Sequence, residues 1–296
     1  MSERSGTAAE RTGRRLQAVI DSVAASDGAG VKLRRSLGSR PNLRFDPFLM
    51  LDEFFSDDPD DYLAGFPSHP HRGFETVTYM LDGRMRHEDS FGNRGDLGPG
   101  DVQWMTAARG IIHSEMPQQA AGRMRGFQLW INLPSGEKMK PAGYRDIPAA
   151  QIPTVALASG GAVRVIAGEF EHEGSRTAGP IGGLSTQPLY FDVRLPAAAM
   201  LSIPTPATHN VFLYVYEGDA VVGEDARPLP FRAAGLLTPG DAVQVRAGAN
   251  GVRALLLAGR PIGEPIVQYG PFVMNTPEEI QQALADYQRG RLAVSG

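Results

Sequence analysis

Four side chains in two short motifs could together bind a metal ion. His69 and His71 are separated by one residue, as are His113 and Glu115, and each pair lies in a segment with the composition of a β-strand. Because successive side chains along a strand point to opposite faces, the members of each pair share a face. If the two strands are neighbours, the set can bind Fe(II), Mn(II), Ni(II), Cu(II) or Zn(II) and leave coordination positions open for substrate.

A second carboxylate competes with Glu115 for a place in this site. Glu75 has the same parity as His69 and His71, so it could complete a His-x-His-x-x-x-Glu ligand set if the strand ran unbroken through Gly73. Glu115 has the shorter spacing from its histidine. We expect only one of the two glutamates to bind the metal, and the other to support the ligands or accept a proton.

The remaining histidines are expected to have structural roles. His87 alternates with Met85 on the strand after Gly83 and is expected to make a structural hydrogen bond. His172 and His209 are isolated in the sequence, which is typical of surface or core histidines.

Composition excludes thiolate chemistry and gives no sign of a nucleic-acid partner. The chain has 296 residues, of which 42% are hydrophobic and 21% charged, with no Cys and a net charge of −4. Any metal must therefore bind to nitrogen and oxygen donors. A chain of this length can form two domains, each with its own core.

The N-terminal region differs in charge from the rest of the chain. Residues 1–45 contain nine Lys or Arg against four Asp or Glu. We interpret residues 1–27 as a partly disordered basic arm, within which residues 11–26 could form a short helix. The first residues given lack the apolar core expected of a signal peptide, and no stretch approaches the roughly 20 apolar residues expected of a membrane span. We therefore expect a cytoplasmic protein, a monomer that binds neither a membrane nor nucleic acid directly.

The chain predicts an all-β fold with one helix. Its 35 Gly and 23 Pro interrupt short segments rich in β-branched and aromatic residues, among them 76–81, 127–131, 163–166 and 211–216. Near the C-terminus, Thr276 is followed by Pro277 and Glu279, which together form the signature of a capped helix N-terminus.

An internal repeat divides the chain into two similar parts. The segment 78–83 (TYMLDG) recurs at 213–218 (LYVYEG), and 97–101 (LGPGD) recurs at 237–241 (LTPGD). Counted from these segments, the positions that match the four candidate ligands are Pro204, Pro206, Arg253 and Leu255. The second copy thus keeps the two repeated segments but has none of the candidate ligands, which favours a metal site in the first copy.

The repeat also predicts the domain boundaries. We expect a metal-binding domain over residues 28–140, a degenerate domain without metal over 150–275, and a C-terminal helix over 276–296. The boundary between the two copies should fall in the polar, Pro-containing stretch 133–153.

Longer motifs around these residues resemble those of the pirin family, within the cupin superfamily. The His-x-His-x-x-x-Glu motif that begins at His69 and the Gly-x-x-His motif that ends at His113 resemble the two cupin motifs. The segments that resemble pirin sequences are residues 46–52, 66–79, 103–107, 110–115 and 265–275. Together they are spread over most of residues 28–290.

The resemblance implies a bicupin, in which two double-stranded β-helix (jelly-roll) barrels face each other. It also implies a single Fe(II) in the first barrel, with His69, His71, His113 and Glu115 as its ligands. Glu115 is thereby favoured over Glu75, although either could be the catalytic base.

Some pirins are similar to quercetin 2,3-dioxygenases, which open a flavonol with O2 and release carbon monoxide. The expected partners are then a small aromatic substrate and O2, and the aromatic residues from which a substrate pocket could be built are Phe48, Phe54, Phe66, Phe74 and Trp104. The alternative is an iron-dependent, redox-sensitive regulator that binds a protein partner, since pirins are also similar to transcriptional co-regulators and to regulators of metabolic enzymes.

Overall fold

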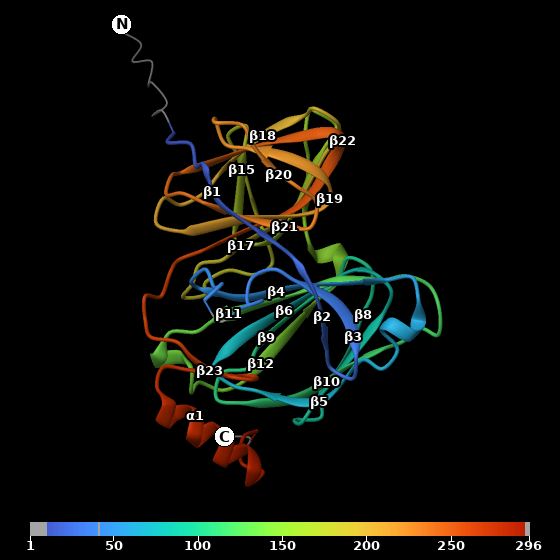
Figure 1. Cartoon of the computed structure of the whole chain (residues 1–296), viewed down its shortest axis with the longest axis vertical. Helices are drawn as coiled ribbons and strands as arrows, with labels where there is room; N and C mark the ends of the chain where they lie inside the picture. Colours follow the sequence, from blue (N-terminus) through green and yellow to red (C-terminus); the bar gives the residue numbers. More distant parts are fainter. Residues whose placement is uncertain (1–10, 41, 294–296) are drawn as a thin grey trace, which may run out of the picture.

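Two β-rich units, here called the first and second domain, are stacked on each other in a computed structural model (Figure 1). The structure describes residues 11–40 and 42–293. Strands dominate both domains and the described residues contain one α-helix, so the prediction of an all-β protein is confirmed. Short 3-10 turns connect some of the strands, namely η1 (Pro59–Asp61), η2 (Ser135–Glu137) and η3 (Ala149–Gln151).

The first domain consists of two sheets whose side chains meet in its interior. The larger sheet has the order β12-β9-β6-β11-β4-β3-β2, with β2 (Val23–Asp27), β3 (Val31–Arg35), β4 (Phe48–Ser56), β6 (Phe74–Asp82), β9 (Val102–Thr106), β11 (Met124–Asn132) and β12 (Gly143–Ile147). The smaller sheet has the order β5-β10-β7-β8, with β5 (Phe66–His71), β7 (Met85–Asp89), β8 (Arg94–Leu97) and β10 (Ile111–Pro117).

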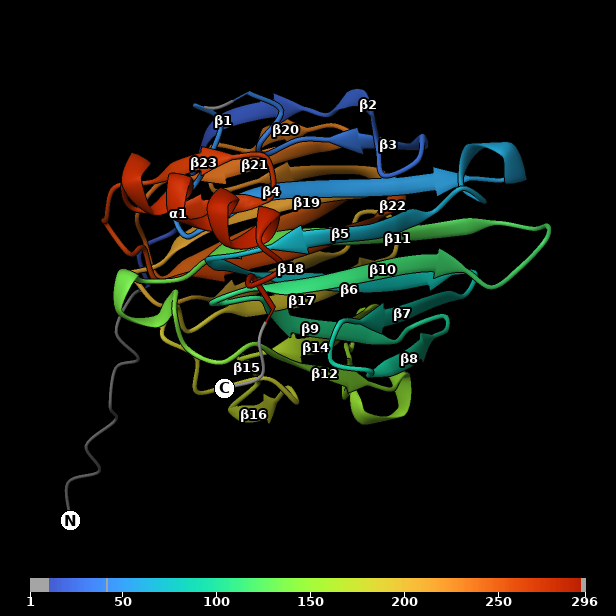
Figure 2. The same cartoon turned by 90° about the horizontal axis from the view of Figure 1, so that it is seen from below.

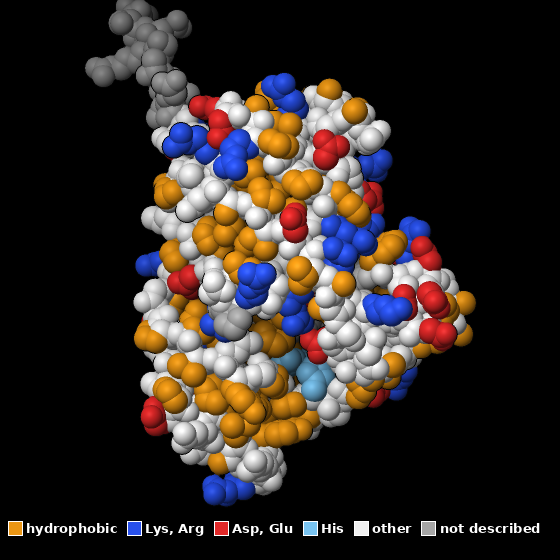
Figure 3. Space-filling model, in the orientation of Figure 1, with side chains coloured by type: hydrophobic (Ala, Val, Ile, Leu, Met, Phe, Trp, Pro, Cys, Tyr) orange, Lys and Arg blue, Asp and Glu red, His pale blue; other side chains and the backbone are white. Residues whose placement is uncertain are grey.

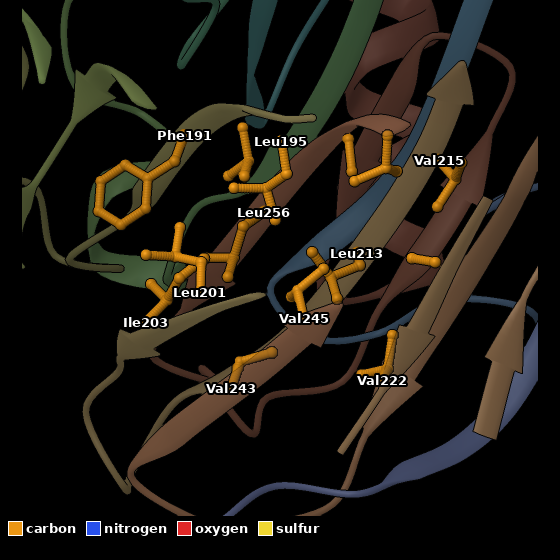
Figure 4. Packing of buried hydrophobic residues seen from close by; sticks show 14 of the residues in the cluster. Phe191, Leu195, Leu201, Ile203, Leu213, Val215, Val222, Val243, Val245 and Leu256 are labelled. Atoms are coloured by element: carbon orange, nitrogen blue, oxygen red, sulfur yellow. The ribbon is translucent and has the colours of Figure 1, made fainter. Parts of the chain in front are cut away.

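The second domain is built around a nine-stranded sheet. Its strands are β1 (Leu16–Asp21), β13 (Thr154–Ala156), β14 (Ala162–Ala167), β17 (Leu189–Leu195), β18 (Met200–Pro204), β19 (Asn210–Val222), β20 (Arg227–Leu229), β21 (Ala233–Leu237) and β22 (Ala242–Gly259). A separate hairpin consists of β15 (Glu169–His172) and β16 (Ser175–Ala178). Apolar side chains such as Phe191, Leu201 and Leu256 point toward one another and fill the interior of this domain (Figure 4).

The N-terminal residues join both domains. β1 pairs with β21 of the second domain, whereas β2 pairs with β3 of the first. The helix predicted over residues 11–26 is therefore wrong, and residues 16–27 are not the disordered arm we expected. Exposure along β1 alternates from residue to residue, as on a strand at a sheet edge, and pairing with β21 outweighs any local preference for helix. The predicted arm over residues 1–10 lies outside the described residues.

The C-terminal residues return to the first domain after the second is complete. They form β23 (Val267–Tyr269), β24 (Phe272–Met274) and α1 (Pro277–Gln288), and α1 lies against the first domain at the end of the molecule (Figures 1 and 2). Thr276 caps α1 and forms a capping box with Glu279, as predicted. Within residues 11–40 and 42–293, no helix is both long and apolar enough to span a membrane.

The strand pairing corrects one part of the internal repeat. β18, the counterpart of β5, pairs with residues 242–246 of β22, whereas Arg253 and Leu255 lie farther along β22 and pair with β17. The predicted match of His113 and Glu115 to Arg253 and Leu255 is therefore wrong. The two Pro-Gly-Asp segments precede different strands: the first leads into β9, which pairs with β6, and the second leads into the part of β22 that pairs with β18.

A buried ionic cluster joins the two domains. Glu53 on β4 is 1% exposed, accepts a hydrogen bond from the Tyr214 hydroxyl at 2.9 Å, and pairs with Arg125 at 3.2 Å and Arg232 at 3.3 Å. Nearby, the Tyr79 hydroxyl donates to Asp192 across the same interface. Loss of one member of such a cluster leaves buried charges without compensation.

We expect Glu53→Gln to lower the free energy of unfolding by about 3 kcal/mol, because two arginines lose their shared counter-ion. Asp57→Asn is the matched control, since Asp57 pairs with Arg123 on the surface and such pairs contribute about 0–1 kcal/mol. Chemical denaturation of both variants measures the difference. Equal stability of the two variants would contradict this role for the cluster.

Candidate metal centre

Three histidines converge where β5 and β10 lie side by side. His69 and His113 are directly opposite each other in the pairing of the two strands, and His71 is two residues farther along β5. The ring centroids are 4.4 Å apart for His69 and His113, 4.7 Å for His69 and His71, and 4.9 Å for His71 and His113. One nitrogen from each ring lies within 4.8 Å of the other two. The shared face predicted from strand parity is therefore present for all three histidines.

Hydrogen bonds indicate which ring nitrogen of His69 and of His113 is free to bind a metal. His69 Nδ1 donates to the Pro67 carbonyl at 2.8 Å, so its Nε2 carries the lone pair, and that Nε2 is 3.0 Å from His71 Nε2. His113 Nδ1 is bonded to His87 Nδ1 at 3.1 Å, while His113 Nε2 is buried and has no partner among the described residues. A buried nitrogen left without a partner at the meeting point of three imidazoles is what a metal site requires.

Two of the three imidazoles, those of His71 and His113, are held in their neutral, metal-binding form by a lowered pKa. The pKa of His71 is well below its usual value, mainly because of burial and then because of the neighbouring His69, while the Pro271 carbonyl acts in the opposite direction. Burial also lowers the pKa of His113, with further contributions from His71 and His69. The residues present thus fit a divalent metal ion bound through nitrogen.

His87 supports the site from the next strand. It lies on β7 directly opposite Glu115 and is fully buried, and its Nδ1 is the partner of His113 Nδ1. The structural hydrogen bond expected for His87 is therefore present, and it fixes the orientation of a candidate ligand.

Glu115 lies on the same face of β10 as His113 but is held by other residues. Its Oε1 accepts a hydrogen bond from the Thr78 hydroxyl at 2.9 Å, and its Oε2 accepts one from Gln128 Nε2 at 2.9 Å. Gln128 is in turn oriented by Trp130, whose Nε1 donates to Gln128 Oε1 at 3.1 Å. Among the described residues, the group of donor atoms within 4.8 Å of one another contains the three histidines and not Glu115.

Glu75 lies on the face of the larger sheet that points away from the three histidines. Its carboxylate accepts hydrogen bonds from Thr106 Oγ1 at 2.6 Å and Trp104 Nε1 at 3.2 Å, and burial raises its pKa. Thr78, three residues along the same strand, points to Glu115, and side chains three apart on a strand face opposite ways. The structure therefore does not bring Glu75 to the histidines.

A cavity of about 800 Å³ opens at His69 and His71, and histidine side chains are visible at the bottom of a hollow in the surface (Figure 3). Of the predicted pocket aromatics, Phe54 and Phe66 line this cavity. Phe74 packs on the His71 ring at 5.2 Å, while Phe48 and Trp104 belong to the core between the domains.

Trp130 was not predicted to take part in the site, yet it lines the cavity and packs on His71 with centroids 5.3 Å apart. Its alternation with Gln128 along residues 127–131 is a signal that both could share the interior face.

The C-terminal segment 271–292, here called the C-terminal strap, packs against the residues that follow β5 and those that precede β10, the two strands that carry the histidines. Arg72, next to His71, donates its backbone N–H to the Pro271 carbonyl and accepts from the Val273 N–H at 3.0 Å. The Arg72 side chain donates to the Arg109 carbonyl before β10 and pairs with Asp286 of α1 at 2.8 Å. Arg72 therefore links the end of β5 and the residues before β10 to α1.

Close backbone packing holds the strap in place. A Cβ atom at Gly73 would collide with the Val273 carbonyl oxygen, and one at Gly110 with the Leu292 carbonyl oxygen. The buried ammonium of Lys138 donates to the Gly73 carbonyl at 2.6 Å and the Val273 carbonyl at 3.0 Å, and burial lowers the pKa of Lys138 to about 8. The strap is thus part of the scaffold that positions His71 and His113.

We expect Asp286→Asn to weaken metal binding about tenfold, because groups that orient metal ligands typically contribute 10–100-fold to affinity. Competition with a fluorescent chelator measures the dissociation constant. Asp96→Asn is the matched control, since Asp96 pairs with Arg86 on the same small sheet but away from the strap. Wild-type affinity in Asp286→Asn would show that the strap does not position the ligands.

Two family models match the chain over most of its length. The model described as Pirin matches residues 30–131, and the model described as Pirin C-terminal cupin domain matches residues 190–293. The chain is 58% identical over 273 residues to a Pseudomonas aeruginosa protein named "Putative quercetin 2,3-dioxygenase", which covers 91% of this chain and 95% of that protein. It is 42% identical over 271 residues to human pirin, covering 90% of this chain and 89% of that protein.

The fold matches a solved structure along its length. The crystal structure of quercetin 2,3-dioxygenase from Acinetobacter baumannii superposes with a TM-score of 0.85 at 34% identity, covering 95% of this chain and 98% of that chain.

Proposed function

Since the chain belongs to the pirin family, we propose that it is a metal-dependent dioxygenase that opens a flavonol with O2 and releases carbon monoxide, as a quercetin 2,3-dioxygenase does. The observation that carries this proposal is the convergence of three histidine nitrogens at a cavity of about 800 Å³. That volume lies within the range of small-molecule sites. The relatives named as quercetin 2,3-dioxygenases support the same reaction.

We propose Fe(II) as the resident metal, held by His69, His71 and His113, with Glu115 as a candidate fourth ligand. Nitrogen and carboxylate donors also accept Mn(II), Ni(II), Cu(II) and Zn(II). A redox-active metal at this point would couple the electron-rich flavonol to O2.

Glu115 is the residue that we propose to accept the proton of the flavonol 3-hydroxyl. Hydrogen bonds from Thr78 and Gln128 orient its carboxylate beside His113. A positioned base of this kind contributes typically 10²–10⁴-fold to a rate. Glu75 is proposed to stabilise the domain interface instead, because its carboxylate is bound to Trp104 and Thr106 on the far side of the sheet.

The residues around the cavity orient the substrate and exclude water. Leu33, Met50 and Phe54 from the large sheet and Phe66 from the small sheet supply apolar walls for a planar aromatic ligand. His71 is 2% exposed and packed between Phe74 and Trp130, so this side of the site is dry.

Turnover of quercetin by the purified, Fe(II)-loaded protein tests the proposal. We expect O2 uptake and carbon monoxide release in equal amounts, at a rate well above those of the metal-free protein and of Fe(II) alone. Turnover no faster than that of free Fe(II) would overturn the dioxygenase proposal and would direct attention to a redox-sensitive regulator, whose Fe(II) and Fe(III) forms should differ in affinity for a partner protein.

A further inference from the structure

One wall of the cavity has a regular pattern of polar and apolar residues. On the interior face of the large sheet, Arg35, Asp52 and Gln128 lie side by side on β3, β4 and β11, since Asp52 is the paired residue of both others. All three line the cavity. They form what we call the polar row.

Apolar rows flank the polar row on both sides. On one side, Leu33 of β3 and Phe54 of β4 are paired, each two residues from the polar row on its strand. On the other side, Met50 of β4 and Trp130 of β11 are paired at the same spacing. These four residues also line the cavity. Residues two apart on a strand are separated by about 7 Å. Each apolar row therefore lies about 7 Å from the polar row, a spacing that accommodates an aromatic ring.

The carboxylate of Asp52 has acceptor capacity left over. Arg35 donates to its two oxygens at 2.8 and 2.7 Å, which occupies one lone pair on each. No other donor reaches Asp52 within residues 11–40 and 42–293, although its side chain is only 4% exposed. Burial raises the pKa of Asp52 to about 6 despite the adjacent guanidinium. A further hydrogen-bond donor would therefore stabilise the ionised carboxylate.

Gln128 connects this wall to the metal centre. It is the neighbour of Asp52 on the adjacent strand and at the same time a donor to Glu115. A ligand bound in the cavity beside His69 and His71 can therefore extend over Gln128 toward Asp52, with its ring faces against the apolar rows.

We propose that Asp52, positioned by Arg35, determines substrate specificity by binding a phenolic hydroxyl remote from the reacting one, so that the cavity selects polyhydroxylated planar aromatics. The hydroxyl donates to the Asp52 carboxylate, and its oxygen can accept from the Arg35 guanidinium. This assignment rests on the proposed function, because it concerns the same cavity.

Binding of two flavonols tests the assignment without turnover. Quercetin carries hydroxyls on both outer rings, whereas 3-hydroxyflavone carries only the reacting hydroxyl. Calorimetric titration of the metal-loaded protein under anaerobic conditions gives both dissociation constants. We expect Asp52→Asn to raise the dissociation constant of quercetin about tenfold or more, since hydrogen bonds to charged groups are among the stronger ones, and to change that of 3-hydroxyflavone less than twofold.

Asp96→Asn is the matched control. Asp96 also pairs with an arginine, Arg86 at 2.6 Å, but it does not line the cavity, so this variant should bind both flavonols as the wild type does. Arg35→Lys keeps a positive charge beside Asp52 without the paired donors and should weaken quercetin selectively, which provides a second test if thermal unfolding shows that Asp52→Asn is not folded.

The outcomes separate this inference from the proposed reaction. Equal weakening of both flavonols, or no change in either, overturns the role of Asp52 whether or not the protein turns over quercetin. Selective weakening of quercetin in a protein that does not oxidise it supports the binding role and overturns the dioxygenase reaction alone.

Discussion

Replacing His113 by alanine is expected to abolish tight metal binding, with a loss of affinity of more than 100-fold, and to reduce quercetin turnover to the level of free metal. His113 Nε2 is buried and has no partner among the described residues, and the ring is oriented by His87. With two imidazoles left, the site has lost one of the three nitrogen donors that converge in the structure, and three protein ligands are usual at a catalytic metal. Elemental analysis after dialysis and an oxygen electrode measure the two effects.

His209→Ala is the matched control for this variant. His209 is also buried, but it lies in the second domain, where its Nε2 is bonded to the Gln187 carbonyl at 2.9 Å. It should keep wild-type metal content and turnover, and thermal unfolding of both metal-free variants shows whether either has lost its fold. A folded His113→Ala variant that retains one tightly bound metal per chain would disprove the three-histidine centre.

Replacing Glu115 by glutamine is expected to lower turnover by about 10²–10⁴-fold while most of the metal binding remains. The amide keeps the size of the side chain and can still bond to Thr78 and Gln128, but it cannot take up a proton at neutral pH. Steady-state rates of O2 consumption, compared at equal metal content, measure the effect.

The Glu75→Gln variant shows which of the two glutamates accepts the proton. Because Glu75 is bonded to Trp104 and Thr106 on the far face of the sheet, this variant should retain turnover within a fewfold of the wild type. If Glu75→Gln were inactive and Glu115→Gln active, the assignment of the base would be reversed.

Strand parity was sufficient to predict the three histidines but not to choose between the glutamates. The parity argument holds only within one strand, and the sequence does not show where a strand ends. β5 stops at His71 and β6 begins at Phe74, with Gly73 between them at a φ of +92°. This turn resets the alternation, so Glu75 faces away from the histidines although its number has the same parity.

Other parts of the site depend on contacts between residues far apart in the chain. The strap brings Asp286 to Arg72, and the cavity wall combines β3, β4 and β11. Local patterns predict a capped helix at Thr276 and a strand at 127–131, but not which surface each one covers. For the same reason the pairing of β1 with the second domain could not be read from residues 16–21.

If the three histidines hold one redox-active metal, an anomalous difference map from crystals of the protein as purified will show the ion between their rings. At the absorption edge of iron, we predict a single strong peak per chain, within bonding distance of Nε2 of His69, His71 and His113. Absence of a peak between these rings in protein that contains metal by elemental analysis, or a peak held by other residues, would disprove the three-histidine metal site.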